Sequence, residues 1–265
     1  YTSLYFVGAG GIGMSALVRY FLAKGYKVAG YDRTQSPLTT ELKAEGLEIV
    51  YEESVESIPD YCRNLETTLV VYTPAIPASH AGLVYFREHG FRVVKRAELL
   101  GLITQSSKGL CFAGTHGKTT TSSMAAHIFH ESPIGCNAFL GGILRNYNSN
   151  LILSEQSPFT VIEADEYDRS FHWLHPYMAV VTATDPDHLD IYGTEEAYLE
   201  SFAHFTSLIQ PGGCLIMKKG IKLVPNVKEG VKIYTYSARD GGDFYAGNIR
   251  IGDGTIVFDF VMPEG

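Results

Sequence analysis

Two glycine-rich loops, each lying between a strand-like run and a helix-like run, constrain this chain more than any other feature. The first loop spans residues 8–13 and follows the apolar run 4–7, and the second spans residues 114–119 and follows residues 109–113. A strand that passes through such a loop into a helix is typical of a parallel sheet covered by helices. Glycine lets backbone N–H groups approach a phosphate closely, and the helix N-terminus adds partial positive charge. The chain therefore predicts an α/β fold with two phosphate-binding loops.

Strand-like and helix-like stretches alternate on both sides of a polar segment at residues 104–109. Before that segment we expect strands and helices in turn, with the strands at 27–31, 47–51, 69–72 and 92–95 and the helices at 14–21, after Ser36–Pro37 and at 79–89. After it we expect helices at 119–130 and 194–209, strands at 160–164, 178–183 and 214–217, and a hairpin turning at Asp253–Gly254. We therefore predict a Rossmann-like parallel-sheet domain over residues 1–106 and a P-loop-type α/β domain over residues 107–265.

The first loop fits the pattern G-x-G-x-x-G, so the backbone around Gly10, Gly11, Ile12 and Gly13 is the predicted diphosphate-binding segment. Asp32 ends the next strand, where related nucleotide folds bind ribose hydroxyls. The motif indicates a diphosphate without saying which molecule carries it. A UDP-sugar, NAD and a purely structural tight turn all remain open at this point.

The second loop resembles a shortened Walker A motif, because Phe112 stands where the first glycine of the full pattern would be. Its Gly-Lys-Thr core is intact, and the Lys118 ammonium would sit on phosphate oxygens while the Thr119 hydroxyl would hold Mg²⁺. The competing interpretation is a helix cap with an exposed lysine. The residues predicted to bind the phosphates of ATP are Gly114, Thr115, His116, Gly117, Lys118, Thr119 and Thr120.

Acidic side chains follow two strands of the second series. Glu163 ends one strand, and His188 follows the next within an Asp-rich segment. Mg²⁺ takes oxygen ligands, often one or two carboxylates together with phosphate, so Glu163 and His188 are candidate metal-site residues beside Thr119. Their alternatives are a solvated acidic loop and a packed histidine. A γ-phosphoryl group moving to a carboxylate approaches an anion, and Lys118 with metal ions would offset that repulsion.

Composition narrows the classes of partner. The net charge is −8 and no cluster of Lys and Arg stands out, which argues against binding to nucleic acid. The four cysteines form no close pair, which favours reduced thiols in a cytoplasmic protein. Apolar runs fall far short of the ~20 residues that a membrane-spanning helix needs, so we expect no membrane partner. The oligomeric state is not readable.

Taken together, the motifs resemble those of a known family. They occur in the order 10–14 (Gly-Gly-Ile-Gly-Met), 114–121 (Gly-Thr-His-Gly-Lys-Thr-Thr-Thr), 137–142 (Asn-Ala-Phe-Leu-Gly-Gly), 163–166 (Glu-Ala-Asp-Glu) and 185–190 (Asp-Pro-Asp-His-Leu-Asp). Their order and spacing resemble the Mur ligases of peptidoglycan synthesis over essentially the whole chain. Within the family they are most similar to the members that attach L-alanine to UDP-N-acetylmuramate.

This resemblance implies roles for the candidate residues. Gly10–Gly13 would hold the diphosphate of a UDP-sugar and not NAD, Lys118 would contact ATP, Thr119 and Glu163 would hold one Mg²⁺, and His188 would belong to a second Mg²⁺ site. The implied reaction phosphorylates the muramate carboxylate with ATP, and the amine of L-alanine then attacks the acyl phosphate to give an amide. Lys118, Glu163 and His188 would be the catalytic residues.

Two departures from the family pattern matter. Several members carry a carbamylated lysine in the helix after the His motif, but residues 194–210 contain no Lys, so we expect no carbamate from that helix. The family also has a third, Rossmann-like domain and downstream Asn and Arg residues, which this chain does not include. We therefore expect the chain to bind ligands but to ligate poorly, below about 1 s⁻¹. Open alternatives are an NAD-dependent oxidoreductase, a nucleotide-dependent switch, and a sister ligase for another amino acid or peptide.

Overall fold

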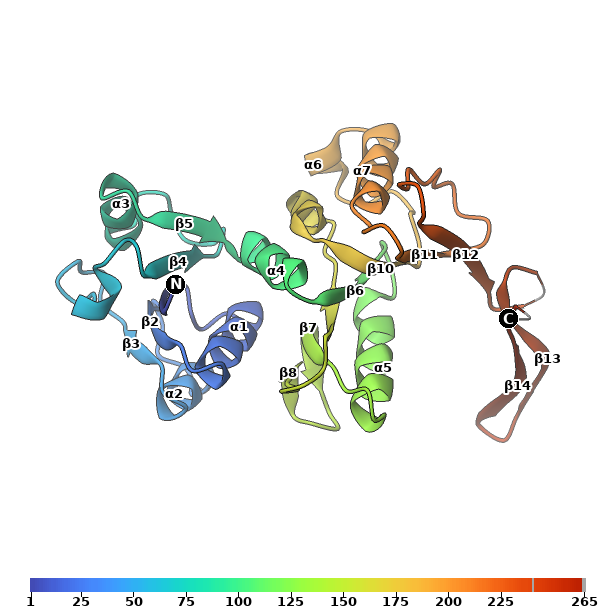
Figure 1. Cartoon of the computed structure of the whole chain (residues 1–265), viewed down its shortest axis with the longest axis horizontal. Coiled ribbons are helices and arrows are strands. Elements are labelled where there is room, and N and C mark those ends of the chain that lie inside the picture. Colours follow the sequence, from blue (N-terminus) through green and yellow to red (C-terminus); the bar gives the residue numbers. More distant parts are fainter. Residues whose placement is uncertain (240, 264–265) are drawn as a thin grey trace. The chain divides into compact units, whose positions relative to one another are not determined.

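A computed structural model describes residues 1–239 and 241–263. The chain forms two compact units, shown in Figure 1. The first contains Tyr1–Ile103 and Cys136–Gln156, and the second contains Thr104–Gly135 and Ser157–Gly265. The units are described separately, and the predicted boundary between residues 106 and 107 stays a prediction.

The first unit is built on a five-stranded parallel sheet. Its strand order is β3 (Glu48–Val50), β2 (Lys27–Tyr31), β1 (Ser3–Val7), β4 (Thr68–Tyr72) and β5 (Arg92–Lys95). The helices are α1 (Ile12–Ala23), α2 (Pro37–Ala44), α3 (Ala81–Glu88) and α4 (Arg96–Gln105), with a short 3₁₀ helix η1 (Asp60–Cys62). The strand order reverses between β1 and β4, and in open α/β sheets ligands bind at such a reversal, beyond the carboxyl ends of the strands. The first glycine loop follows β1 at this point.

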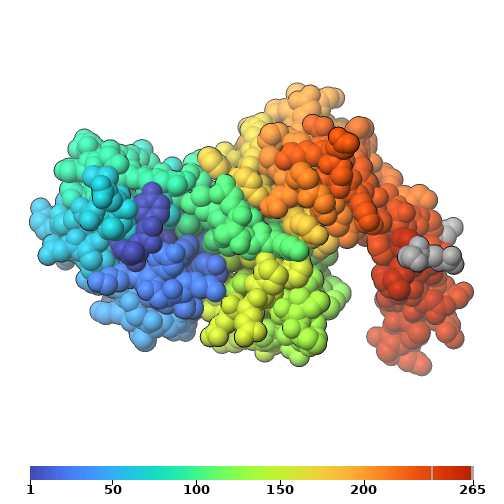
Figure 2. Space-filling model, in the orientation of Figure 1, coloured from blue at the N-terminus to red at the C-terminus, as the bar shows by residue number. Residues whose placement is uncertain are grey.

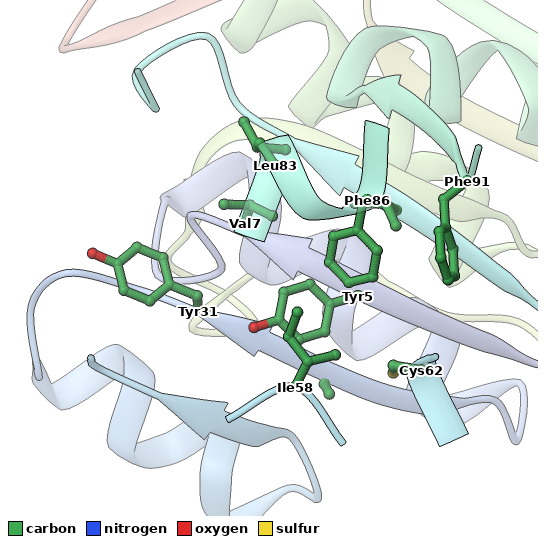
Figure 3. Packing of buried hydrophobic residues seen from close by; sticks show 10 residues of the cluster. Tyr5, Val7, Tyr31, Ile58, Cys62, Leu83, Phe86 and Phe91 are labelled. Carbon is green, nitrogen blue, oxygen red and sulfur yellow. The ribbon is translucent and has the colours of Figure 1, made fainter. Parts of the chain in front are cut away.

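Aromatic packing holds α3 on the sheet. The Tyr5 ring on β1 lies 5.1 Å from the Phe86 ring on α3, and Phe86 in turn lies 5.0 Å from Phe91. Figure 3 shows these rings together with the smaller side chains of the same cluster. Aromatic pairs at such separations add to the stabilisation that comes from burying their area. The cluster fixes the sheet that carries the first glycine loop.

An antiparallel hairpin made of β7 (Asn137–Leu144) and β8 (Ser149–Ile152) also belongs to the first unit. It packs against α1, where the Tyr20 ring lies 5.1 Å from the Phe139 ring. The Asn150 side-chain amide donates to the Ile12 carbonyl over 2.6 Å. These contacts tie the hairpin to the first turn of the helix that follows the glycine loop.

The second unit has a mixed sheet. Its strands follow the order β14 (Thr255–Val261), β13 (Phe244–Gly252), β12 (Lys232–Ser237), β11 (Cys214–Lys218), β10 (Pro176–Val181), β6 (Lys108–Ala113) and β9 (Phe159–Glu163). All neighbours are parallel except β13 and β14, which form the hairpin expected around Asp253–Gly254. The helical elements are α5 (Lys118–Glu131), η2 (Tyr167–Trp173), α6 (Leu189–Tyr192) and α7 (Glu195–Ser207). The predicted α/β class is confirmed.

The sequence pattern of α7 accounts for its position. Thr194 caps the helix, because its hydroxyl accepts a hydrogen bond from the Ala197 amide over 3.1 Å. Tyr198, Phe202 and Phe205 recur at helical spacing and are fully buried, as the periodicity predicts. None of the helices in the described ranges combines the length and the apolar composition needed to cross a bilayer.

One expectation about a helix boundary is wrong. The helix expected from Ser79 begins at Ala81 instead, and the ring nitrogen Nδ1 of His80 accepts the capping hydrogen bond from the Leu83 amide. Helix α4 was not among the expected elements, and it continues to Gln105, within the polar segment at residues 104–109. Buried Leu99, Leu100 and Ile103 give α4 an apolar side that is too short to stand out from the polar residues after it.

Candidate functional site

The first glycine loop connects β1 to α1 and has the backbone that its sequence predicts. Gly8 lies at φ +90°, and the amides of Gly8 and Ala9 donate to the Tyr31 carbonyl on β2. Gly11 is the N-cap of α1 and has no side chain to cap the helix. Within the described ranges, the amides of Ile12 and Gly13 have no protein acceptor, as expected for the first turn of a helix. The loop therefore presents free N–H groups beside Gly11 and Ile12, which are exposed.

Asp32 is placed against this loop. One carboxylate oxygen accepts from the Gly10 amide over 2.7 Å, and the other accepts from the Thr34 amide over 3.0 Å. A Cβ added to Gly10 would lie 2.6 Å from the Thr39 side chain and 2.9 Å from the Asp32 carboxylate. The absence of a side chain at Gly10 thus allows Asp32 to brace the loop. Its expected role toward ribose hydroxyls stays a prediction.

The second glycine loop connects β6 to α5 and depends on a glycine at its start. Gly114 lies at φ +135°, and a Cβ there would lie 2.8 Å from the Ala183 amide, closer than such atoms ever approach. The same Cβ would collide with the Thr182 hydroxyl. The close approach lets the loop pack on the end of β10, where Thr115 donates from its amide to the Ala183 carbonyl over 3.0 Å.

Side chains from the residue after β10 and from α7 hold the loop in shape. The Thr182 hydroxyl lies 2.5 Å from the His116 carbonyl and donates to it. The Thr115 hydroxyl lies 2.9 Å from the Tyr198 hydroxyl and donates to the Asp185 carbonyl over 2.7 Å. These bonds orient the loop so that Gly117, at φ +81°, leads directly into α5.

Lys118 is the first residue of α5, and its ammonium bends back over the loop. The Nζ donates to the Gly114 carbonyl over 2.8 Å and to the Glu166 Oε1 over 2.8 Å. The Glu166 Oε2 also lies 2.8 Å from Nζ but outside hydrogen-bond geometry, so charge alone holds it. The Glu166 side chain is 1% exposed and the Lys118 side chain 15% exposed. Burial raises the pKa of Glu166, and the hydrogen bond from Lys118 opposes that rise.

Thr119 and Glu163 form a pair of oxygen donors. The Thr119 hydroxyl donates to the Glu163 carboxylate over 2.9 Å, which joins the first turn of α5 to the end of β9. One hydroxyl and one carboxylate beside a phosphate loop fit Mg²⁺, which keeps several waters and takes phosphate oxygens as further ligands. No group of three or more His, Cys, Asp or Glu in the described part of the chain forms a ready-made metal cage. Phosphate or water oxygens would therefore have to complete the coordination.

Two histidines lie near this site. His188 lies in the segment that follows β10, and His116 lies in the second glycine loop. The His188 ring packs edge-on against Tyr167 at 5.3 Å, and its Nε2 lies 3.8 Å from the Asp187 carboxylate. His188 occupies the N-cap position of α6 without a side-chain capping hydrogen bond, at φ +52°, a conformation that non-glycine residues seldom adopt. His116 is exposed and lies 3.8 Å from Asp185. A metal role for His188 stays a prediction.

The structure thus brings together Lys118, Thr119 and Glu163 at the carboxyl ends of neighbouring strands, where the sequence predicted a site. It adds two residues to which the sequence analysis gave no role. Glu166 contacts Lys118, and Thr182 holds the loop. Glu166 stood in a quoted motif, but nothing in the pattern indicated that its side chain turns inward. Thr120 is exposed in the first turn of α5.

Family models match nearly the whole chain. Residues 3–108 match the "Mur ligase family, catalytic domain", and residues 112–265 match the "Mur ligase middle domain". The Parabacteroides distasonis UDP-N-acetylmuramate–L-alanine ligase is 68% identical over 263 residues, which is 99% of this chain and 57% of that protein. The chain thus spans less than two thirds of the length of the curated relatives it matches.

Solved structures show the same fold. The UDP-N-acetylmuramate:L-alanyl-γ-D-glutamyl-meso-diaminopimelate ligase of Neisseria meningitides matches with a TM-score of 0.78 at 21% identity, covering 96% of this chain and 85% of that one. The UDP-N-acetylmuramate–alanine ligase of Thermotoga maritima matches with a TM-score of 0.74 at 24% identity, covering 93% and 54%. At these identities the likeness concerns the fold.

Proposed function

The chain belongs to the Mur ligase family, and on this premise we propose that it carries the UDP-sugar and ATP sites of a ligase that joins L-alanine to UDP-N-acetylmuramate. The identity of 68% to a ligase of that name supports the choice within the family. The reaction belongs to peptidoglycan precursor synthesis, and we expect it to take place in the cytoplasm. The choice of L-alanine rests on relatives of that name and on the order of the motifs.

One observation carries the proposal. The Lys118 ammonium and the Thr119–Glu163 pair lie at the second glycine loop, and the first glycine loop, which follows β1, has free amides. A dehydrogenase needs only one dinucleotide loop and gives Lys118, Thr119 and Glu163 no purpose. Two nucleotide-type loops suit an enzyme with two phosphate-bearing substrates. The presence of two such loops favours a ligase over an oxidoreductase or a simple switch.

In the proposed reaction the amides of Ile12 and Gly13 bind the diphosphate of the UDP-sugar, and Lys118 binds the terminal phosphates of ATP. Thr119 and Glu163, with His188 for a second ion, would hold Mg²⁺, which would neutralise charge on the phosphate oxygens. The muramate carboxylate takes the γ-phosphoryl group and ADP leaves. The alanine amine then attacks the acyl phosphate, forming the amide and releasing phosphate.

Calorimetric titration tests this proposal directly. We expect UDP-N-acetylmuramate to bind the chain and NADH not to bind. We also expect Lys118→Ala to abolish ATP binding in the presence of Mg²⁺, since it removes the positive charge that is held over the loop. Binding of NADH without binding of the UDP-sugar would replace the ligase by an oxidoreductase. Binding of ATP unchanged in Lys118→Ala would remove the second loop from the site.

A further inference from the structure

Lys118, the phosphate-binding lysine of the proposed function, already has an anionic partner inside the protein. Its ammonium lies 2.8 Å from both carboxylate oxygens of Glu166 and 2.8 Å from the Gly114 carbonyl. An ammonium group has three donor hydrogens. The carboxylate and the carbonyl use two of them, which leaves one for any phosphate that enters the loop.

The Glu166 carboxylate is fixed in this position. Glu166 is the N-cap of η2. Its backbone carbonyl accepts hydrogen bonds from the Arg169 amide over 3.0 Å and from the Tyr192 hydroxyl. The Arg169 guanidinium in turn lies over the Tyr192 ring at 4.7 Å. Because the side chain is 1% exposed, the carboxylate has no path to solvent without unpacking this region.

A buried carboxylate beside a phosphate-binding ammonium has two opposing effects. Without nucleotide it neutralises a charge that is largely removed from water, and this stabilises the folded loop. With nucleotide present, the carboxylate and the phosphates are like charges that compete for one cation in a site of low dielectric constant. The geometry therefore opposes phosphate binding while it holds the lysine ready.

We propose that Glu166 is the counter-ion of Lys118 in the nucleotide-free protein, and that it positions the ammonium over the loop and weakens the binding of the nucleotide phosphates. This inference rests on the proposed ATP site. Glu166 is a positioning residue, because it acts on the phosphates through Lys118. Nucleotide binding then includes the transfer of the lysine's charge from an internal carboxylate to the phosphates.

The test compares the affinity of the chain for Mg·ATP and for adenosine, measured by calorimetry in wild type and Glu166→Gln. Removing the competing charge should lower the dissociation constant for Mg·ATP about fivefold and leave that for adenosine unchanged. Without nucleotide, the variant should also melt at a lower temperature than wild type. Saturating ATP should raise the melting temperature of the variant more than that of wild type. Damage to the loop would instead weaken binding, so a gain in affinity separates the two causes.

Two further variants complete the test. Asp165→Asn removes an exposed carboxylate from the neighbouring position, and its affinity for Mg·ATP should stay as in wild type. Glu166→Asp keeps the charge at a greater distance from the ammonium, so its affinity should lie between those of wild type and Glu166→Gln. This variant decides the matter if Glu166→Gln does not fold.

Each remaining outcome counts against the inference. An unchanged or raised dissociation constant in a folded Glu166→Gln overturns it, as does an equal gain in Asp165→Asn. A Glu166→Asp variant that binds more weakly than wild type overturns it too. If unaltered protein does not bind Mg·ATP, the assignment of the nucleotide site fails first and the inference falls with it.

Discussion

At the scale of single residues, Gly114 is the position of the second glycine loop that least tolerates a side chain. Its backbone angle disfavours any side chain, and a Cβ would lie 2.8 Å from the Ala183 amide. We expect Gly114→Ala to lower the free energy of unfolding by about 2–4 kcal/mol, because backbone strain and a steric clash add. Urea unfolding would measure this, and Mg·ATP binding should be lost.

Gly212 provides the matched control for this change. Its φ is also positive, at +81°, but a Cβ there would meet nothing within 4 Å. Gly212→Ala should therefore cost only the strain, about 1 kcal/mol. Equal losses in the two variants would show that the close approach at Gly114 does not matter for folding.

His172 is a second residue whose chemistry follows from its position. Burial lowers its pKa, the nearby His204 and Arg169 lower it further, and the contact with the Ser201 carbonyl opposes them. The histidines of the unfolded chain have a pKa of about 6.5, so the unfolded chain binds more protons than the folded protein below that pH. Stability is thus present above that value and falls as the pH decreases towards the lowered pKa of the folded state.

We expect the free energy of unfolding to decrease between pH 7.5 and pH 5.5 and to decrease less in His172→Gln, as denaturant titrations at the two values would show. Burial also lowers the pKa of His80 and of His175, so some dependence should remain in the variant. An identical pH dependence in wild type and variant would contradict the prediction.

The sequence could predict some of the residues around the second glycine loop but not others. Lys118, Thr119 and Glu163 could be proposed from the sequence, because phosphate and metal chemistry favour those residue types at the ends of strands, and their roles stay predictions. Glu166 and Thr182 act through side-chain direction, which depends on the backbone of η2 and on the register of β10 with β6. No local pattern carries that information.

At the scale of elements, the β13–β14 hairpin has an unusual surface. Strand pairing sets Ile251 opposite Ile256, and the alternation of side chains then puts Phe258 on the same face. Ile251 is 79% exposed and Ile256 64% exposed. Figure 2 shows the hairpin, in red, at the surface of the second unit. A two-stranded hairpin with an uncovered apolar face attracts hydrophobic dyes and other chains.

Replacing Ile256 and Phe258 with serine should therefore reduce the fluorescence of a dye that binds apolar surface. The free energy of unfolding should change by less than about 1 kcal/mol, because neither side chain is buried. Phe202→Ala, at a fully buried position of α7, should cost about 3–5 kcal/mol. Unchanged dye fluorescence in the double variant would show that the bound dye lies elsewhere.

Elements with long and regular patterns were predicted best. The strands that flank both loops, α7 and the β13–β14 hairpin follow from apolar spacing and turn residues. The β7–β8 hairpin was missed, because Gly141 and Gly142 interrupt the strand pattern and a register shift separates its paired ends. The start of α3 was missed because a histidine, not a serine, provides its cap. Tertiary contacts decide such cases.

At the scale of the whole molecule, the two loops belong to different compact units. Gly10 lies in the first, and a Cβ there would press on the Asp32 carboxylate that braces the loop. Lys118 lies in the second. If each unit holds one substrate, damage to one loop should leave the binding of the other substrate intact.

We therefore expect a crossed result when Gly10→Ala and Lys118→Ala are each titrated with UDP-N-acetylmuramate and with Mg·ATP. Gly10→Ala should weaken the UDP-sugar about tenfold or more, because the Gly10 amide and Asp32 can no longer keep their hydrogen bond, and should leave Mg·ATP unchanged. Lys118→Ala should do the reverse, since the ammonium that it removes lies over the second glycine loop, in the other compact unit. If either variant weakened both ligands equally, the two sites would be coupled and one-substrate-per-unit would be wrong. If the two variants weakened the same ligand, both loops would serve one nucleotide, and a ligase with two phosphate-bearing substrates would lose its structural basis.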